Sequence, residues 1–350
     1  MITLPTLNVA LVGYGYAGKT LHAPLIDSVP GLNLAVVCSS KPETVAMHRP
    51  AVQVSRFVDE VFASPDIDVV VIATPNDTHF DLCWRALLSG KHVVVDKPFT
   101  VTSAHARELK MIAERQNVVL SVFQNRRWDA DFLTLRAIIE SGKLGEIASL
   151  VSRFDRYRPE VKTRWREQAG EGSGLWYDLG PHLLDQALQL FGRPTAIQAN
   201  FEIQRSHAQV VDYFDVQMLY EHMGVTLRAS LLVTEESPRF ELKGSAGSYI
   251  KFGLDTQEDA LKRGESPVDD RWGYDPRDGV LQILTGEGSI STVAPTLNGD
   301  YRQFYKEFRD AVLLRKANPV SLDDAVLTIE LIELACESAG SGCELLVPAH

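Results

Sequence analysis

The chain has 350 residues, of which 45% are hydrophobic, and its formal net charge is −11 at pH 7. This length is more than one hydrophobic core usually organises, so it predicts two domains. The acidic charge excludes nucleic acid and an anionic membrane surface as expected partners, and the longest apolar runs, such as residues 67–73, are far shorter than the roughly 20 residues of a membrane-spanning helix.

The N-terminal stretch MITLPTLNVALVG has no basic leader before its apolar run, so we expect a cytoplasmic protein whose first strand begins there. Four cysteines show neither metal-ligand spacing nor a disulfide framework, which suits a reducing compartment. They are Cys38, Cys83, Cys336 and Cys343.

The first 122 residues alternate short β-branched runs with amphipathic stretches, which is a βαβ succession. Several runs are apolar at nearly every position, which is typical of parallel strands covered by helices on both faces. The α/β fold class therefore begins with a doubly wound Rossmann domain, residues 1–123. Pro24 predicts a kinked or short first helix, and Thr102 or Ser103 is a plausible N-cap. The predicted strands are 7–12, 32–38, 52–55, 68–74, 91–96 and 117–123, and the predicted helices are 77–89 and 102–116.

Residues 124–350 have a different texture and predict an α+β domain with a mostly antiparallel open sheet, for substrate binding and oligomerisation. Residues 254–299 predict loops with short strands. Since one face of this sheet has no predicted helix cover, we expect it to bury itself against a copy in a homodimer or homotetramer. The predicted strands are 196–204, 212–220, 225–233 and 239–251, and the predicted helices are 129–141, 181–191, 300–316 and 321–339, the last with Ser321 and Asp324 as a capping box.

The glycine-rich stretch GYGYAG follows the first strand and opens a helix. In this context Gly13 permits a tight turn, Gly15 lets a diphosphate approach the backbone and Gly18 allows close helix packing. The pattern predicts dinucleotide binding, and the alternative is a tight turn that binds no ligand.

The end of the second strand normally selects the cofactor. Here it reads Cys38, Ser39, Ser40, Lys41, with no carboxylate at the tip that would bind the ribose 2′-hydroxyl of NAD. Two hydroxyls and an ammonium group suit a 2′-phosphate, so the sequence favours NADP over NAD. A solvated loop is the alternative, and Glu43 could still serve NAD.

Two further strands end in polar residues, at the sheet edge where open α/β sheets bind ligands. ATPNDTHF (73–80) ends the fourth strand, although Pro75 and Asn76 also fit an ordinary turn. Lys97 ends the fifth strand immediately before Pro98, where it could hydrogen-bond a reacting hydroxyl or exchange its proton. A solvated lysine is the alternative.

The stretch GEGSGLWYDLGPHLLDQ (170–186) offers a second set of chemical groups. A helix that starts near Gly180 would have Asp178 at its mouth and would place His182 and Asp185 on one face. Histidine has its unperturbed pKa close to neutrality, so His182 is suited to move the proton of an alcohol. A metal held by Asp178, His182 and Asp185 is the alternative, but no further ligand cluster accompanies them, so no metal is predicted.

Together GYGYAGK, ATPNDTH, DKP and GSGLWYDLGPHLLD resemble the glucose-fructose oxidoreductase, inositol dehydrogenase and MocA family, from residue 8 to about 340. The strings GYGYA, HAPL and NRRWD (125–129) resemble the branch of NADP-dependent scyllo-inositol 2-dehydrogenase. The resemblance implies Lys97, Asp178 and His182 as catalytic residues. It implies that the cofactor is bound by Gly13, Tyr14, Gly15, Tyr16, Ala17, Gly18, Ser39, Ser40, Lys41, Thr74, Pro75, Asn76, His79, Asp96, Lys97, Asn125, Trp165, Arg166 and Tyr301.

The implied function is hydride transfer between NADP, or alternatively NAD, and a secondary alcohol of a sugar or cyclitol. The family's usual Glu-Lys-Pro is Asp96-Lys97-Pro98 here, which retracts the carboxylate by one methylene and leaves the lysine in place. A non-catalytic, nucleotide-binding regulator on the same fold is the alternative function. Tyr157, Arg158, Trp165, Trp176 and Tyr177 could line a sugar pocket or could belong to the core.

Overall fold

The computed structural model describes residues 5–349, which form two compact units. The first unit contains residues 5–125 and two later segments, 257–272 and 300–329. The second unit contains residues 126–256, 273–299 and 330–349. The chain thus returns twice to its first unit after leaving it.

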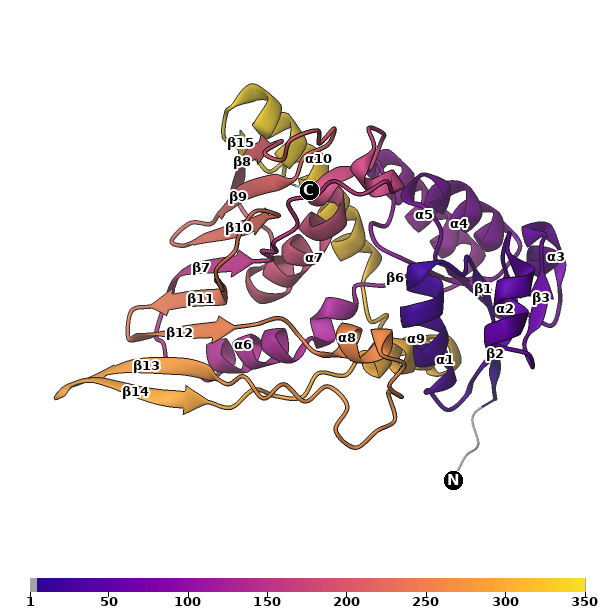
Figure 1. Ribbon diagram of the computed structural model, residues 1–350, viewed down its shortest axis with the longest axis horizontal. Helices are drawn as coiled ribbons and strands as arrows, with labels where there is room; N and C mark the ends of the chain where they lie inside the picture. The colour runs from indigo at the N-terminus through magenta and orange to yellow at the C-terminus, as the bar shows by residue number, and fades with distance from the viewer. Residues whose placement is uncertain (1–4, 350) are drawn as a thin grey trace. The chain divides into compact units, whose positions relative to one another are not determined.

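The first unit contains a six-stranded parallel sheet with the order β3-β2-β1-β4-β5-β6, the order of a doubly wound dinucleotide-binding fold (Figure 1). β4 is buried at all four positions and β5 at three of four, so both faces of the sheet are covered. The predicted Rossmann architecture is confirmed. Its strands are β1 (Leu7–Val12), β2 (Leu32–Cys38), β3 (Gln53–Ser55), β4 (Val69–Ile72), β5 (His92–Val95) and β6 (Leu120–Val122).

The helices predicted at 77–89, 102–116 and 300–316 are present in this unit. Pro24 lies in the first turn of the short α1 (Ala23–Asp27), directly after the π-helical turn η1 (Gly18–His22), where a missing amide hydrogen costs little. The Thr102 hydroxyl accepts the amide of His105 at 3.4 Å and caps α5 (Ser103–Gln116). The other helices are α2 (Pro42–His48), α3 (Val58–Ala63), η2 (Asn76–Thr78), α4 (His79–Leu88), α8 (Gln257–Lys262) and α9 (Arg302–Leu314).

The second unit contains a nine-stranded sheet with the order β14-β13-β12-β11-β7-β10-β9-β8-β15. Neighbouring strands are antiparallel except β7 and β10, so the prediction of a mostly antiparallel sheet is confirmed. The strands are β7 (Ile147–Arg153), β8 (Ala196–Glu202), β9 (Tyr213–Leu219), β10 (Gly224–Ser230), β11 (Pro238–Gly244), β12 (Gly247–Phe252), β13 (Gly279–Thr285), β14 (Gly288–Ala294) and β15 (Leu345–Leu346).

Helix α7 (Gly174–Phe191) packs on β9 and β10 and builds the core of this unit. Trp176 of α7 is 1% exposed, and its ring centroid lies 4.9 Å from that of Phe214. The remaining helices are α6 (Ala130–Glu140), η4 (Trp165–Glu167) and two that include residues of both units, η3 (Asn125–Trp128) and α10 (Leu322–Ser341).

The predicted start of a helix at residue 181 is wrong, because α7 begins seven residues earlier at Gly174. Gly180 and Pro181 suggest a helix start but lie inside α7. A Cβ on Gly180 would lie 2.5 Å from the ring of Trp176, so the glycine makes room for this buried indole. Burial of apolar side chains in the first turns of α7 offsets the free-energy cost of the backbone hydrogen bond that Pro181 cannot form.

Other differences from the predicted elements lie in the second half of the chain and at residues 147–153. The predicted strand 239–251 is a hairpin of β11 and β12, with a turn at residues 245–246. β7, α8 and β15 are not predicted by the sequence, and residues 254–299 contain two seven-residue strands among their loops. Ser321 accepts the amide of Asp324 at 3.0 Å, which is one half of the predicted capping box.

No helix among residues 5–349 combines the length and the apolar character that crossing a bilayer demands.

Candidate functional site

Close packing of the backbone explains two of the three glycines in the turn after β1, Gly13 and Gly18. Gly13 has a φ of +96°, and a Cβ there would lie 2.4 Å from the carbonyl oxygen of Ala73. A Cβ on Gly18 would lie 2.1 Å from the carbonyl oxygen of Gly13. Both distances are far below van der Waals contact, so a larger residue at either position would displace backbone.

Gly15 has neither requirement. Its φ is outside the left-handed region, and a Cβ would meet nothing within 4 Å. The chain itself therefore does not explain a glycine at this exposed position. A ligand that approaches the backbone closely does, and a diphosphate is such a ligand.

The other residues of the turn are accessible. Tyr14 and Ala17 are partly exposed, and Tyr16 is 49% exposed while its hydroxyl donates to Glu258 at 2.6 Å. The amide of Gly13 donates to the carbonyl of Cys38 at 2.9 Å, which ties the turn to the end of β2.

At the end of β2, the Ser39 hydroxyl accepts the amide of Lys41 at 3.1 Å, and Ser40 and Lys41 are exposed. Glu43, the carboxylate that could have served NAD, forms an exposed ion pair with Arg56 at 2.7 Å. The groups at the tip of this strand are thus two hydroxyls and an ammonium group, while the exposed Glu43 carboxylate on the following helix is paired with Arg56.

His79 connects the ends of β4 and β5. Its Nδ1 lies 2.8 Å from the carbonyl oxygen of Pro98, and its Nε2 lies 3.0 Å from that of Thr74. The ring is fully buried, and burial lowers its pKa, while the nearby carboxylate of Asp96 opposes this shift. Thr74 is partly exposed, so the end of β4 is accessible even though His79 is buried.

The end of β5 carries Asp96 and Lys97. Asp96 is 7% exposed, and its Oδ1 accepts the amide of Lys97 at 2.8 Å. Asp96, which is one methylene shorter than the glutamate usual in the family, therefore accepts a hydrogen bond from the backbone amide of Lys97. Lys97 is partly exposed and is joined to Pro98 by a cis peptide bond.

The remaining residues implied for cofactor binding in this unit differ in exposure. Pro75 is exposed, whereas Asn76 and Asn125 are 4% and 5% exposed. Tyr301 is fully buried, and its amide donates to Gln257 at 2.7 Å.

A buried histidine that the sequence did not single out lies behind the glycine turn. His22 is fully buried, and its Nδ1 lies 2.6 Å from the hydroxyl of Tyr305. Burial lowers the pKa of His22 to about 4; Asp96 opposes this shift and His79 adds to it. Its position in the HAPL string was the only signal in the sequence.

In the second unit, α7 carries two of the three predicted catalytic residues. Asp178 and His182 are four residues apart within this helix, so they share one face. Asp178 is partly exposed, and its Oδ1 lies 3.6 Å from Nε of Arg166. The Arg166 guanidinium in turn lies 4.8 Å from the ring of Trp165, which is 38% exposed. Four of the predicted residues are therefore grouped around the first half of α7.

Asp185, the third residue of the metal alternative, has a different role. It accepts two hydrogen bonds from Arg127, at 2.9 and 2.6 Å, and both side chains are buried. Within residues 5–349, no group of three or more His, Cys, Asp or Glu side chains is arranged to hold a metal ion.

No sequence pattern indicates the buried polar network around the NRRWD string. Arg239 is 2% exposed and donates to Asp131 at 3.1 Å and to Gln186 of α7 at 2.6 Å. Gln186 donates to the carbonyl of Arg126 at 2.9 Å. Sequence patterns assign arginines to the surface, so only the three-dimensional contacts reveal that these fix α7.

The aromatic residues considered for a sugar pocket divide between core and surface. Trp176 belongs to the core and donates from its indole nitrogen to the carbonyl of Ile332 at 3.2 Å. Tyr157 is 58% exposed.

Comparisons with known proteins agree with both units. Residues 7–124 match the model of an oxidoreductase family, NAD-binding Rossmann fold, and residues 136–345 match its C-terminal alpha/beta domain. The chain is 50% identical to the oxidoreductase YdgJ of Escherichia coli over 95% of this chain and 96% of YdgJ. It is 37% identical to the scyllo-inositol 2-dehydrogenase (NADP(+)) IolW of Bacillus subtilis, over 95% and 94%.

An oxidoreductase from Bacillus cereus has a crystal structure that superposes with a TM-score of 0.91 at 30% identity, over 99% of each chain. Two family models and two relatives above 30% identity span almost the whole sequence. The chain belongs to the Gfo/Idh/MocA family of oxidoreductases, with an NAD-binding Rossmann domain.

Proposed function

We propose that this oxidoreductase uses NADP to exchange a hydride with a secondary alcohol of a sugar or cyclitol. The observation that carries the proposal is the open space at Gly15, which the packing of the chain does not require and which a diphosphate would occupy. The accessible hydroxyls of Ser39 and Ser40 and the ammonium of Lys41 favour NADP, and the Bacillus subtilis relative IolW is named as an NADP(+) dehydrogenase.

The residues at the carboxyl edge of the sheet fit the dinucleotide. The glycine turn would hold the diphosphate, and the β2 end would hold the adenosine ribose with its 2′-phosphate. Thr74, Asn76, Asp96 and Asn125 come from the ends of β4, β5 and β6. When bound, the dinucleotide supplies the hydride acceptor or donor of the reaction.

The chain's own residues move the proton. We propose that His182 takes the proton of the substrate hydroxyl and that Lys97 donates a hydrogen bond to the same oxygen, stabilising its developing negative charge. Asp178, one helical turn before His182 and paired with Arg166, orients the imidazole or the substrate. General base assistance of this kind contributes about 10²- to 10⁴-fold in rate.

His79 and Tyr301 differ from the other residues implied for cofactor binding, because both are fully buried. Because the His79 ring also faces two backbone carbonyls, we propose that it positions the ends of β4 and β5 rather than touching the nucleotide.

The two parts of the sequence would have different functions. We propose that residues 1–123 bind the nucleotide and that residues 124–350 bind the substrate and associate with a copy. The cytoplasmic location stays a prediction.

The experiment is a panel of inositols and hexoses tested with NADP and with NAD, followed by absorbance at 340 nm. We expect turnover with at least one polyol and a higher kcat/KM with NADP. A chain that binds nucleotide but turns over none of the polyols or the corresponding ketoses would instead be a regulator on the same fold, which is the alternative function.

A further inference from the structure

Arg205 is a buried cation in the turn between β8 and β9, and no motif of the sequence contains it. Its side chain is 2% exposed, and its Nε donates to Oδ2 of Asp212 at 2.9 Å. The Asp212 carboxylate is also buried and accepts the backbone amides of Gln204 and Arg205, at 2.7 and 3.0 Å. Arg205 is therefore fixed by its own turn, while its other N–H groups can bind elsewhere.

These other N–H groups bind residues 158–168, the stretch before α7 that contains η4 and that we call the η4 segment. Nη1 of Arg205 donates to the carbonyl oxygens of Arg158 and Glu160, at 3.1 Å each. Nη2 lies 3.3 Å from Oε2 of Glu167. Because these partners lie at the two ends of the η4 segment, one guanidinium holds both ends.

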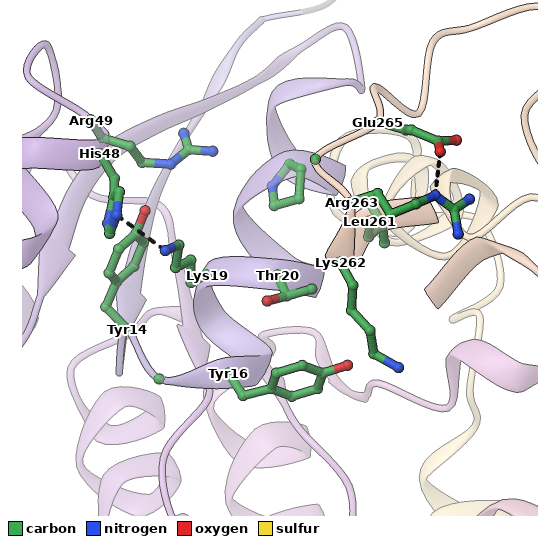
Figure 2. A pocket seen from close by; sticks show the side chains of 13 residues that line it. Tyr14, Tyr16, Lys19, Thr20, His48, Arg49, Leu261, Lys262, Arg263 and Glu265 are labelled. Atoms are coloured by element: carbon green, nitrogen blue, oxygen red, sulfur yellow. Dashed lines mark hydrogen bonds and ion pairs between the residues drawn. The ribbon is translucent and has the colours of Figure 1, made fainter. Parts of the chain in front are cut away.

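Glu167 folds the η4 segment around its carboxylate, whose side chain is 6% exposed. It accepts the amide of Lys162 at 3.0 Å and Nε of Arg164 at 2.7 Å. The pair of Arg263 and Glu265 beside the pocket in Figure 2 is different, since both side chains are more than half exposed. Exposed pairs contribute little, whereas removing one partner of a buried pair leaves an unpaired charge and is costly.

The η4 segment carries Arg166, the residue before Glu167. Nε of Arg166 lies 3.6 Å from Oδ1 of Asp178, and η4 lies against α7. The start of α7 is tied to the same turn that contains Arg205, because the amide of Leu175 donates to the carbonyl of Val211 at 2.7 Å. The turn between β8 and β9 thus anchors the segments that carry both partners of the Arg166–Asp178 pair.

We propose that Arg205 and Glu167 are positioning residues for the reaction. Their pair holds the η4 segment so that Arg166 stays beside Asp178, one helical turn before His182. This inference rests on the proposed function, in which Asp178 orients the imidazole or the substrate. A misplacement of about 1 Å in a reacting group costs about 10²-fold in rate, so a loosened η4 segment lowers turnover while the fold persists.

Glu167→Gln is the test variant, because it removes the ionic contact with Arg205 and leaves the buried Arg205–Asp212 pair in place. Glu241→Gln is the matched control. Glu241 accepts a hydrogen bond from Arg153 at 2.7 Å in the same unit, where it joins β11 to β7. The full-length parent and both variants are compared, and thermal unfolding verifies that each is folded.

The first readout does not depend on turnover. Limited trypsin digestion detects opening of the η4 segment, which has cleavage sites after Lys162, Arg164 and Arg166. Loss of one charged hydrogen bond predicts that Glu167→Gln is cut at these sites about 10-fold faster than the parent, and that Glu241→Gln is cut at the parent's rate. Equal cleavage rates in all three proteins would overturn the proposal.

The second readout separates positioning from stability. For Glu167→Gln we expect kcat on the best polyol to fall about 10-fold or more, with KM and the Kd of NADP within a few-fold of the parent. In an Arg166→Gln background the same change should have little further effect, because Glu167 acts through Arg166.

An unchanged kcat in Glu167→Gln, or effects of the two changes that simply multiply, would overturn the proposal. Absence of turnover in the parent would instead count against the proposed function. The digestion alone would then decide whether the Arg205–Glu167 pair holds the η4 segment.

Discussion

At the scale of single residues, the glycines of the turn after β1 have different roles: packing requires Gly13 and Gly18, whereas only a ligand would require Gly15. Gly15→Ala should leave the melting temperature unchanged, because its Cβ meets no atom within 4 Å. It should weaken dinucleotide binding, since the methyl group would occupy the position of the diphosphate. Thermal unfolding and calorimetry measure the two effects.

Gly18→Ala is the matched comparison. Its Cβ would lie 2.1 Å from the carbonyl of Gly13, so we expect a loss of stability of about 1–3 kcal/mol or more. If Gly15→Ala bound the dinucleotide as the parent does, the turn would be glycine-rich for reasons of chain geometry, and the proposed nucleotide site would lose its main support.

His22 predicts a stability change in mild acid. Its pKa is about 4 in the folded chain and about 6.5 when unfolded, so the unfolded state binds the additional proton between these values. The free energy of unfolding should therefore fall as the pH drops from 6.5 to 4, by about 3 kcal/mol from this group.

The control for this prediction is His22→Gln, which cannot titrate. Its unfolding free energy should be lower at pH 7.5, because the contact with Tyr305 is altered, but should depend less on pH across that window. His79, whose pKa is also lowered by burial, contributes equally to both proteins. Equal pH slopes in urea denaturation would show that His22 does not titrate as its burial indicates.

At the scale of elements, the buried contacts of α7 fix the helix that carries His182. Breaking a buried ion pair by removing one partner costs about 3–5 kcal/mol, because the remaining charge stays buried. We therefore expect Arg127→Met and Asp185→Leu each to lower the unfolding free energy by about 3 kcal/mol, and the double variant to lose less than the sum.

Urea denaturation of the four proteins gives this double-mutant cycle. Additive losses would mean that the two side chains are not coupled, despite hydrogen bonds of 2.9 and 2.6 Å.

The elements also show what sequence patterns can and cannot predict. The six parallel strands were predictable because most of them are apolar runs and all are bounded by turn residues or helical stretches. The start of α7 was not, because Gly180 and Pro181 have the local preferences of a helix boundary, and only the burial of Trp176 against Gly180 outweighs them. The turn at residues 245–246 interrupts a strand pattern that continues through it.

The candidate site divides in the same way. Motifs predicted the glycine turn and Lys97 at strand ends and His182 on a helix, since these residues follow recognisable runs. Asp178 was expected at the mouth of that helix but lies inside it, because α7 begins at Gly174. The Arg127–Asp185 pair, the buried ring of His79 and the Arg205–Glu167 pair join residues far apart in the sequence or bond to distant backbone, so no local pattern reveals them.

At the scale of the whole molecule, one face of the second sheet predicts self-association. Ile250, Val280 and Val293 lie in register across β12, β13 and β14, and they are 37%, 47% and 65% exposed. Contiguous exposed apolar side chains are typical of interfaces, so we expect a second copy to cover them.

The double variant Val280→Lys, Val293→Lys should dissociate this assembly, as measured by light scattering at micromolar concentration. Met47→Lys is the control, because Met47 is 79% exposed in the first unit. A parent protein that is monomeric at this concentration would refute the expectation.

The central claim is that an ammonium group and an imidazole from different parts of the chain act on one substrate oxygen. The most direct measurement is NADP-linked turnover, followed at 340 nm on the best polyol, for the parent, Lys97→Met and His182→Gln, together with the Kd of NADP for each protein. The account predicts that both variants bind NADP within a few-fold of the parent and turn over about 10²-fold or more slowly. Turnover of Lys97→Met or His182→Gln at the rate of the parent would contradict it.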